Sequence, residues 1–190
     1  MNIKEEILSY NVSRETYASL ERFVDLLTEW NNKMNLVSKK SLLDVWIRHV
    51  LDSIQLINYI PDSMDTLVDI GSGSGFPGVV LAILLKERKP SVKIKLIESI
   101  TKKTVYLKSV CVELGLDNVE IVNDRVQSID GKDVTKEYNL GAAISLELAK
   151  KHHVNCAILK QRSPSCGVGK IYDGTFSGTV IDGYGVTATL

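Results

Sequence analysis

The chain has 190 residues, of which 23 are basic and 23 acidic, so its formal net charge is zero. This length accommodates one well-cored domain with a small appendage, but not a second full domain. A balanced charge gives no overall field that attracts nucleic acid, so any RNA contact must come from local basic patches. The three cysteines include no C-x-x-C pair, which argues against a disulfide framework and a closed zinc site, and we expect no metal.

The N-terminal segment, MNIKEEILSY, is charged and amphipathic, unlike a secretory signal. No apolar run approaches the roughly 18 residues that a membrane span requires. The sequence therefore predicts a soluble, cytoplasmic protein without membrane contact.

The first 60 residues are predicted to be helical. Apolar side chains between Leu20 and Trp30 recur at helical spacing, and Ser13 is a candidate cap for this helix. A second helical pattern runs from Leu42 to Ile57. It places six apolar side chains on one face, namely Trp46, Ile47, Val50, Leu51, Ile54 and Ile57.

From Asp65 onward, predicted strands alternate with predicted helices. The strands are Thr66 to Ile70, Lys93 to Ile97 and Val119 to Val122, and the helices are Gly78 to Lys86 and Lys102 to Leu114. This alternation predicts the α/β class, with a parallel sheet and right-handed crossovers. Ligands of such sheets bind beyond the carboxyl ends of the strands.

A glycine-rich turn follows the first of these strands in the stretch LVDIGSGSGFPG, from Leu67 to Gly78. Gly71, Gly73 and Gly75 allow the backbone to turn tightly and to bring its N–H groups close to a ligand. The spacing of the glycines also contains G-x-G-x-x-G, which by itself is weak support for a dinucleotide site. The turn is therefore a candidate cradle for a nucleotide-type cofactor.

The residues around the glycine turn narrow the choice of cofactor. A P-loop is excluded because no Lys-Ser or Lys-Thr follows the glycines. Asp69 would repel a pyrophosphate but would attract the sulfonium and ammonium groups of S-adenosylmethionine, so its charge favours that cofactor. Glu98 ends the next strand, where a carboxylate can accept both ribose hydroxyls of an adenosine group, which fits either cofactor.

The last third of the chain differs from the rest in composition and in its predicted elements. Val134 to His152 is predicted to form a helix and Val154 to Leu159 a buried strand. Residues 163 to 190 are rich in Gly, Ser and Thr and contain short strand-like pieces. We expect the strand to add to an open edge of the parallel sheet.

Five ordered motifs across residues 1–129 resemble the GidB/RsmG family. They are WNNKMNLVS, IRHVLDSI, VDIGSGSGFPG, LIES followed by two lysines, and NDRVQS. The family consists of class I methyltransferases that move the methyl group of S-adenosylmethionine to N7 of a guanine in small-subunit ribosomal RNA. The resemblance implies a helical cap over residues 1–60, a Rossmann-like part over residues 61–129, and the small ribosomal subunit as partner.

The resemblance also implies roles for individual residues. Gly71 and Phe76 fall where the family contacts the cofactor in the glycine turn, and Glu98 where it holds the ribose. Val126 and Gln127 fall where the family brackets the adenine. By the same comparison, Asp69 lies near the methionine end of the cofactor.

Further residues are expected around the mouth of the site. Asn35, Arg48 and His49 belong to the helical part that covers the site in the family, and Arg48 and His49 are candidates for a catalytic or a purely structural role. Lys102 and Lys103 begin a helix beside the cleft and are candidates for contact with RNA phosphates.

Residues 130–190 depart from this family, because the expected Ile-Ser-Arg-Ala motif is replaced by Ile144-Ser145-Leu146-Glu147. They contain four other motifs, GKDVTKEY, AILKQRSPSCG, IYDGTFSG and DGYGVTATL. With these motifs they resemble instead the C-terminal part of the thiouracil-desulfurase-related family. The sequence thus predicts a truncated methyltransferase sheet that is continued by a small α/β segment. The resemblance makes Cys166 the counterpart of one of three cysteines that hold an iron–sulfur cluster in that second family, so sulfur chemistry at Cys166 is an alternative function. Non-catalytic binding of S-adenosylmethionine is another alternative.

Overall fold

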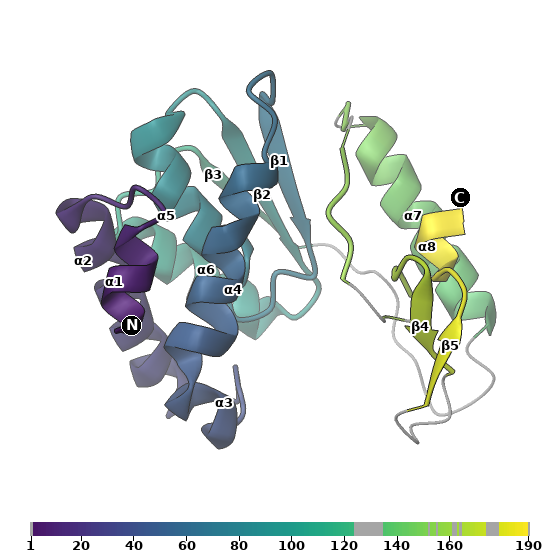
Figure 1. The fold of residues 1–190 in the computed structure, drawn as a ribbon, viewed down its shortest axis with the longest axis horizontal. Coiled ribbons are helices and arrows are strands. Elements are labelled where there is room, and N and C mark those ends of the chain that lie inside the picture. Colours follow the sequence, from purple (N-terminus) through teal and green to yellow (C-terminus); the bar gives the residue numbers. More distant parts are fainter. Residues whose placement is uncertain are drawn as a thin grey trace. The chain divides into compact units, whose positions relative to one another are not determined.

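The computed structural model describes residues 2–123, 135–151, 153–154, 156–160, 163, 165–173 and 179–189. The chain divides into two compact units, Met1–Asp124 and Arg125–Leu190. Figure 1 shows the elements of each unit. The predicted boundary between residues 129 and 130 stays a prediction.

A three-stranded parallel sheet forms the centre of the first unit. Its strands are β1 (Thr66–Ile70), β2 (Lys93–Glu98) and β3 (Val119–Asn123), in the order β1-β2-β3. The three predicted strands are confirmed to within one residue. Because the strands are parallel, their carboxyl ends meet at one edge of the sheet, where a ligand site is expected.

Two crossover helices pack on this sheet. α5 (Gly78–Arg88) joins β1 to β2, and α6 (Thr101–Glu113) joins β2 to β3. Seven consecutive apolar residues of α5, Val79 to Leu85, are buried, as expected for a helix enclosed between two layers. Figure 1 shows the helical layer of α1 and α2 on the side of α5 and α6 away from the sheet.

The N-terminal helices are α1 (Ile3–Leu8) and α2 (Arg14–Asn31). The predicted cap of α2 is confirmed, because Ser13 Oγ accepts a hydrogen bond from the backbone N–H of Thr16 at 3.1 Å. Leu20, Phe23 and Leu27 lie on the buried face of α2. This face packs on α5 and α6 and fixes the cap to the sheet.

The second predicted helix is broken into four short elements. They are α3 (Lys39–Leu43), the π-helix η1 (Trp46–Leu51), α4 (Asp52–Ile54) and the 3-10 helix η2 (Gln55–Tyr59). The prediction of one continuous apolar face is therefore wrong at Ile47, which is 61% exposed, although Val50 and Ile54 are fully buried. The physical reason is that a π-helix places more residues in each turn and so rotates positions away from a 3.6-residue face.

The second unit contains α7 (Thr135–Lys151), an antiparallel pair of β4 (Lys170–Tyr172) and β5 (Val180–Asp182), and α8 (Val186–Thr189). The predicted strand from Val154 to Leu159 is wrong, because its described residues have no regular secondary structure. Ile158 is 50% exposed, so this apolar run is not a buried strand. An apolar run becomes a strand only where a neighbouring strand accepts its hydrogen bonds, and the sequence pattern does not show whether one does.

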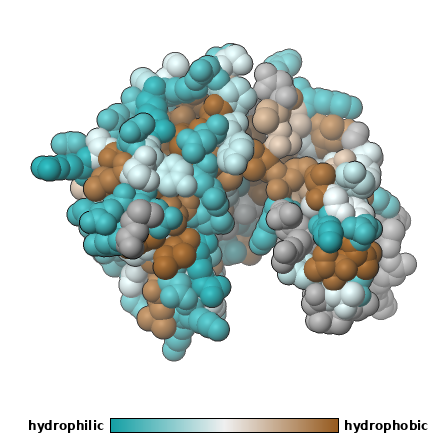
Figure 2. Space-filling model, in the orientation of Figure 1, coloured by the Kyte–Doolittle hydropathy of each residue, from teal (hydrophilic) through white to brown (hydrophobic). Residues whose placement is uncertain are grey.

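On the face drawn in Figure 2, the N-terminal unit is mostly hydrophilic, with separate apolar patches. Its large apolar side chains instead gather between the sheet and the helices. Among the described residues, no helix is both long and apolar enough to span a membrane.

Candidate cofactor site

The glycine turn joins the end of β1 to the start of α5. Gly71, Gly73 and Gly75 have φ angles of +80°, +54° and +93°, a left-handed conformation that glycine adopts without steric cost. A Cβ added to Gly71 would have no described heavy atom within 4 Å, and one added to Gly73 would meet the Gly71 carbonyl oxygen at 3.6 Å. The turn therefore borders open space at its first two glycines, which lets a ligand approach the backbone.

The rest of the turn is held tightly by the protein. The backbone N–H groups of Gly71 and Ser72 both donate to the carbonyl oxygen of Ile97, at 2.8 and 3.0 Å. A Cβ added to Gly75 would lie 2.8 Å from Val79 Cγ2, so this glycine serves packing. The three predicted glycines thus differ, since two face open space and the third lets α5 approach the turn.

The Asp69 side chain stabilises the end of the turn through a hydrogen bond to the start of α5. Its Oδ2 accepts a hydrogen bond from the backbone N–H of Gly78 at 3.1 Å. Burial raises the pKa of Asp69 from 3.8 to about 6, and the charge of Glu98 adds to this shift, although hydrogen bonds from Ser72 and Gly78 oppose it. The fold thus disfavours the ionised carboxylate, and a cation bound beside it would favour ionisation again.

Glu98 connects the turns that follow β1 and β2. It is 5% exposed. Its Oε2 accepts from the backbone N–H of Gly73 at 2.9 Å, and its Oε1 accepts from the backbone N–H of Ile100 at 2.8 Å. The Ser99 hydroxyl also donates to Oε1, at 3.4 Å. Each carboxylate oxygen has two lone pairs, so Oε2 can accept a further hydrogen bond from a ligand hydroxyl.

Phe76 contacts the helical cap. Its ring lies 4.8 Å from the ring of His49 in a stacked arrangement and 5.2 Å from the ring of Phe23. The Nε2 atom of His49 is hydrogen-bonded to the hydroxyl of Ser41 on α3. The structure therefore brings His49 to the glycine turn, whereas the Arg48 side chain is exposed and pairs at 3.1 Å with Asp44, which caps the end of α3.

The structure shows no hydrogen bond or ion pair between the remaining predicted residues that it describes and the glycine turn. Lys102 and Lys103 lie in the first turn of α6, shortly after the loop that follows Glu98, and Lys102 is exposed. Val126 and Gln127 lie outside the described residues. The roles of all the predicted site residues stay predictions.

Tyr106 is a site residue that the sequence analysis missed. It is fully buried, and its hydroxyl donates to the carbonyl oxygen of Ser74 in the glycine turn at 3.1 Å. Its ring meets that of Trp30 edge to face at 5.7 Å, and burial raises the pKa of the phenol. The only sequence signal was a tyrosine on the apolar face of α6, which does not distinguish a turn-positioning residue from a packed ring.

The cysteines do not form a group. Cys111 is buried, Cys166 is partly buried and Cys156 is exposed. The Sγ atom of Cys166 lies 3.9 Å from the carbonyl oxygen of Lys160. In the parts of the chain that the structure describes, no three His, Cys, Asp or Glu side chains are grouped to hold a metal ion.

The parallel sheet with its crossover helices defines an α/β protein, and a glycine turn beside two carboxylates is typical of its ligand-binding members. Comparison with protein families identifies the family of α/β proteins to which the chain belongs. Residues 16–161 match the family described as GidB, rRNA small subunit methyltransferase G. The chain belongs to this family.

Individual relatives agree with the family match. The Ribosomal RNA small subunit methyltransferase G of Ruegeria pomeroyi is 44% identical over 123 residues, which cover 65% of this chain and 59% of the relative. The protein of the same name from Orientia tsutsugamushi is 44% identical over 126 residues, which cover 66% of this chain and 60% of the relative. The chain thus spans about three fifths of the length of these curated relatives.

One solved structure is similar to part of the chain. It is a [4Fe-4S]-dependent thiouracil desulfidase, 44% identical, with a TM-score of 0.29. The match covers 31% of this chain and 39% of the desulfidase.

Proposed function

We propose that this chain binds S-adenosylmethionine at the glycine turn and transfers its methyl group to N7 of a guanine in small-subunit ribosomal RNA. Membership of the GidB family and the names of the relatives, ribosomal RNA small subunit methyltransferase G, support the proposal. The observation that carries it is the space beside Gly71 that no described residue fills, next to the Glu98 carboxylate, which accepts the backbone N–H of Gly73.

The residues around the turn fit this cofactor chemically. The open positions at Gly71 and Gly73 allow the backbone to contact a ligand closely. Asp69 would hold the cationic methionine end, and Glu98 would accept hydrogen bonds from the ribose hydroxyls. When bound, S-adenosylmethionine supplies a methyl group on a positively charged sulfur. The proposal therefore assigns cofactor binding to residues 1–129.

The proposed reaction makes modest demands on the protein. Guanine N7 carries a lone pair in the plane of the base and needs no deprotonation before it attacks a methyl group. The protein must align the base and stabilise the positive charge that develops on it, so catalysis rests on positioning and electrostatics. His49 is a candidate for this positioning, because it stacks on Phe76 at the turn and is fixed by Ser41.

Isothermal calorimetry with S-adenosylmethionine tests the first half of the proposal. We expect the wild type to bind and Asp69→Ala to lose about 10- to 100-fold in affinity, because a charge-assisted contact is removed. Asp62→Ala is the matched control, because this exposed carboxylate precedes β1, at the opposite edge of the sheet, and pairs with Lys89. Absence of wild-type binding, or equal losses in both variants, would overturn the proposed site.

Methyl transfer tests the second half. The protein is incubated with labelled S-adenosylmethionine and small ribosomal subunits that lack the modification, and the labelled nucleotide is identified by mass spectrometry. Label at N7 of a guanine supports the proposal. Cofactor binding without transfer would instead identify the chain as a non-catalytic S-adenosylmethionine binder.

A further inference from the structure

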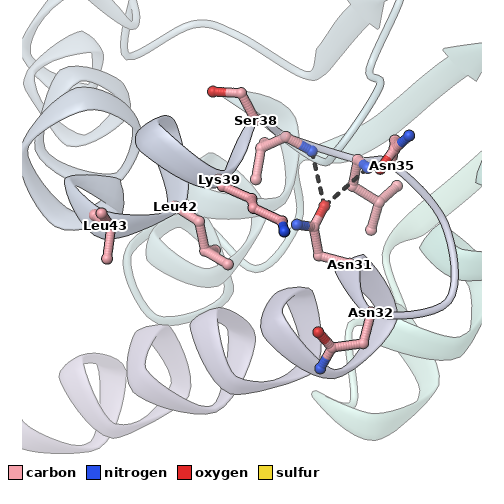
Figure 3. Close-up of a pocket in the computed structure, with 9 residues that line it drawn as sticks. Asn31, Asn32, Asn35, Ser38, Lys39, Leu42 and Leu43 are labelled. Atoms are coloured by element: carbon pink, nitrogen blue, oxygen red, sulfur yellow. Dashed lines mark hydrogen bonds between the residues drawn. The ribbon is translucent and has the colours of Figure 1, made fainter.

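A hollow of about 860 Å³ lies in the helical cap, between the end of α2, the loop that follows it, and α3. Figure 3 shows Asn31 and Asn32 at the end of α2, Asn35 in the loop and Lys39 and Leu42 on α3. The volume is in the range of ligand sites, and the lining mixes amide, aliphatic and basic side chains. Of these residues only Asn35 was expected around the mouth of the cofactor site, and the structure places it in the hollow instead.

The loop that forms one wall is preorganised. The Oδ1 atom of Asn31 accepts hydrogen bonds from the backbone N–H groups of Leu36 and Val37, both at 2.9 Å (Figure 3). Asn32 and Asn35 are exposed, and neither side chain has a hydrogen-bonding partner among the described residues. The hollow thus presents two amides on a fixed loop, and each amide carries both donors and an acceptor.

Lys39 lines the hollow, and the segment that forms its walls is basic in a protein without net charge. Residues 31–43 contain Lys33, Lys39 and Lys40 and no acidic residue. The flanking carboxylates are already paired, because Glu29 lies 3.2 Å from Arg22 and Asp44 lies 3.1 Å from Arg48. The three lysines are therefore not neutralised by these neighbours, and an anionic ligand is favoured.

Two contacts connect the walls of the hollow to the glycine turn. On α3, Ser41 is hydrogen-bonded to His49, which stacks on Phe76. At the end of α2, Trp30 packs against Tyr106, whose hydroxyl donates to Ser74 in the turn. A ligand in the hollow would thus lie against elements that directly support the cofactor cradle.

We propose that this hollow binds nucleotides of single-stranded RNA that flank the methylated guanine, an inference that rests on the proposed function. Lys39 and Lys40 would contact phosphates, and Asn32 and Asn35 would hydrogen-bond to base edges. The apolar wall includes Leu42 and the 87% exposed Leu43, which offer an aliphatic surface to a base face. RNA suits this combination of amides, aliphatic walls and unneutralised lysines, because a nucleotide presents a polar edge, a flat face and a phosphate together.

Fluorescence anisotropy with a labelled single-stranded RNA of about 12 nucleotides, measured over a salt series, tests the basic part of the site. The slope of log affinity against log salt is negative, and we expect Lys39→Ala/Lys40→Ala to reduce its magnitude by about 1.4, since each phosphate contact contributes about 0.7. Lys93→Ala is the control, because this exposed lysine begins β2 at the far edge of the sheet, and we expect it to leave the slope unchanged.

The amides are tested separately at fixed salt. We expect Asn35→Ala to weaken binding of the same RNA by about fivefold, the equivalent of one hydrogen bond, and the exposed Asn58→Ala on η2 to leave it unchanged. Photo-crosslinking with thiouridine in the RNA should place cross-links within residues 31–43. Calorimetry with S-adenosylmethionine on each variant verifies that the cofactor site is folded.

The outcomes separate this inference from the proposed function. Cross-links confined to α6 around Lys102, with normal cofactor binding, would overturn the hollow as an RNA site and leave the proposed function standing. Absence of wild-type RNA binding, or binding of a protein partner at the hollow that RNA does not displace, would also overturn it. Failure of the wild type to bind S-adenosylmethionine would count against the proposed function instead.

Discussion

Replacing Asp69 by Asn should stabilise the unliganded protein at neutral pH. Burial holds the pKa of Asp69 at about 6 instead of 3.8, so the folded state favours the neutral carboxyl. The stability that this group contributes is complete below its unfolded pKa and is lost as the pH rises towards 6. At about 1.4 kcal/mol per pKa unit, the loss at neutral pH amounts to about 3 kcal/mol. Asn keeps the shape and an acceptor for the Gly78 N–H without the charge.

Urea unfolding of both proteins at several pH values measures this effect. We expect the two free energies of unfolding to agree near about pH 4 and to diverge by up to about 3 kcal/mol at about pH 6.5, with Asp69→Asn the more stable. Asp62→Asn is the control with opposite sign, because a hydrogen bond from Lys89 lowers the pKa of Asp62. An Asp69→Asn protein that is less stable than wild type, or a difference that does not change with pH, would refute the reasoning.

Two further substitutions and one labelling experiment test other contacts. Gly78→Ala should destabilise by about 1 to 3 kcal/mol in urea unfolding despite the better helix propensity of Ala, because the new Cβ would lie 2.4 Å from Asp69 Oδ2; a more stable variant would contradict this. Glu98→Gln should cost about 1 to 3 kcal/mol, because one side-chain oxygen cannot serve two N–H groups as well as a carboxylate does, and an unchanged Tm would disprove it. Cys111, whose pKa burial raises to about 11, should resist iodoacetamide at about pH 8 while the exposed Cys156 reacts, as peptide mass spectrometry can check.

The sequence predicted the central part of the fold well because its signals are local. The strand from Thr66 to Ile70 and the cap at Ser13 are defined by neighbouring residues, and both are confirmed. The π-helix around Ile47 was not predictable, because apolar spacing does not reveal an enlarged turn. The strand predicted from Val154 failed because strand formation depends on a partner that the local pattern does not contain.

The candidate site was predictable in composition and less so in geometry. The glycines, Asp69 and Glu98 could be named from their positions at strand ends. The sequence could not show that Asp69 turns inward to Gly78, nor that Glu98 already accepts two backbone hydrogen bonds. Tyr106 was missed for the same reason, since its contact with the turn depends on how α6 packs.

The order of the sheet has a consequence for how the first unit folds. Thr66 pairs with Lys93 and Ile94 pairs with Val119, so each strand pairing closes across a single helix. Such pairings need only short loop closures and form quickly compared with pairings between distant segments. During synthesis, β1 and β2 can pair before β3 is made, and all three described strands of this sheet are available once Asn123 has left the ribosome. The cofactor cradle between β1 and β2 is thus among the first tertiary features that the growing chain can form.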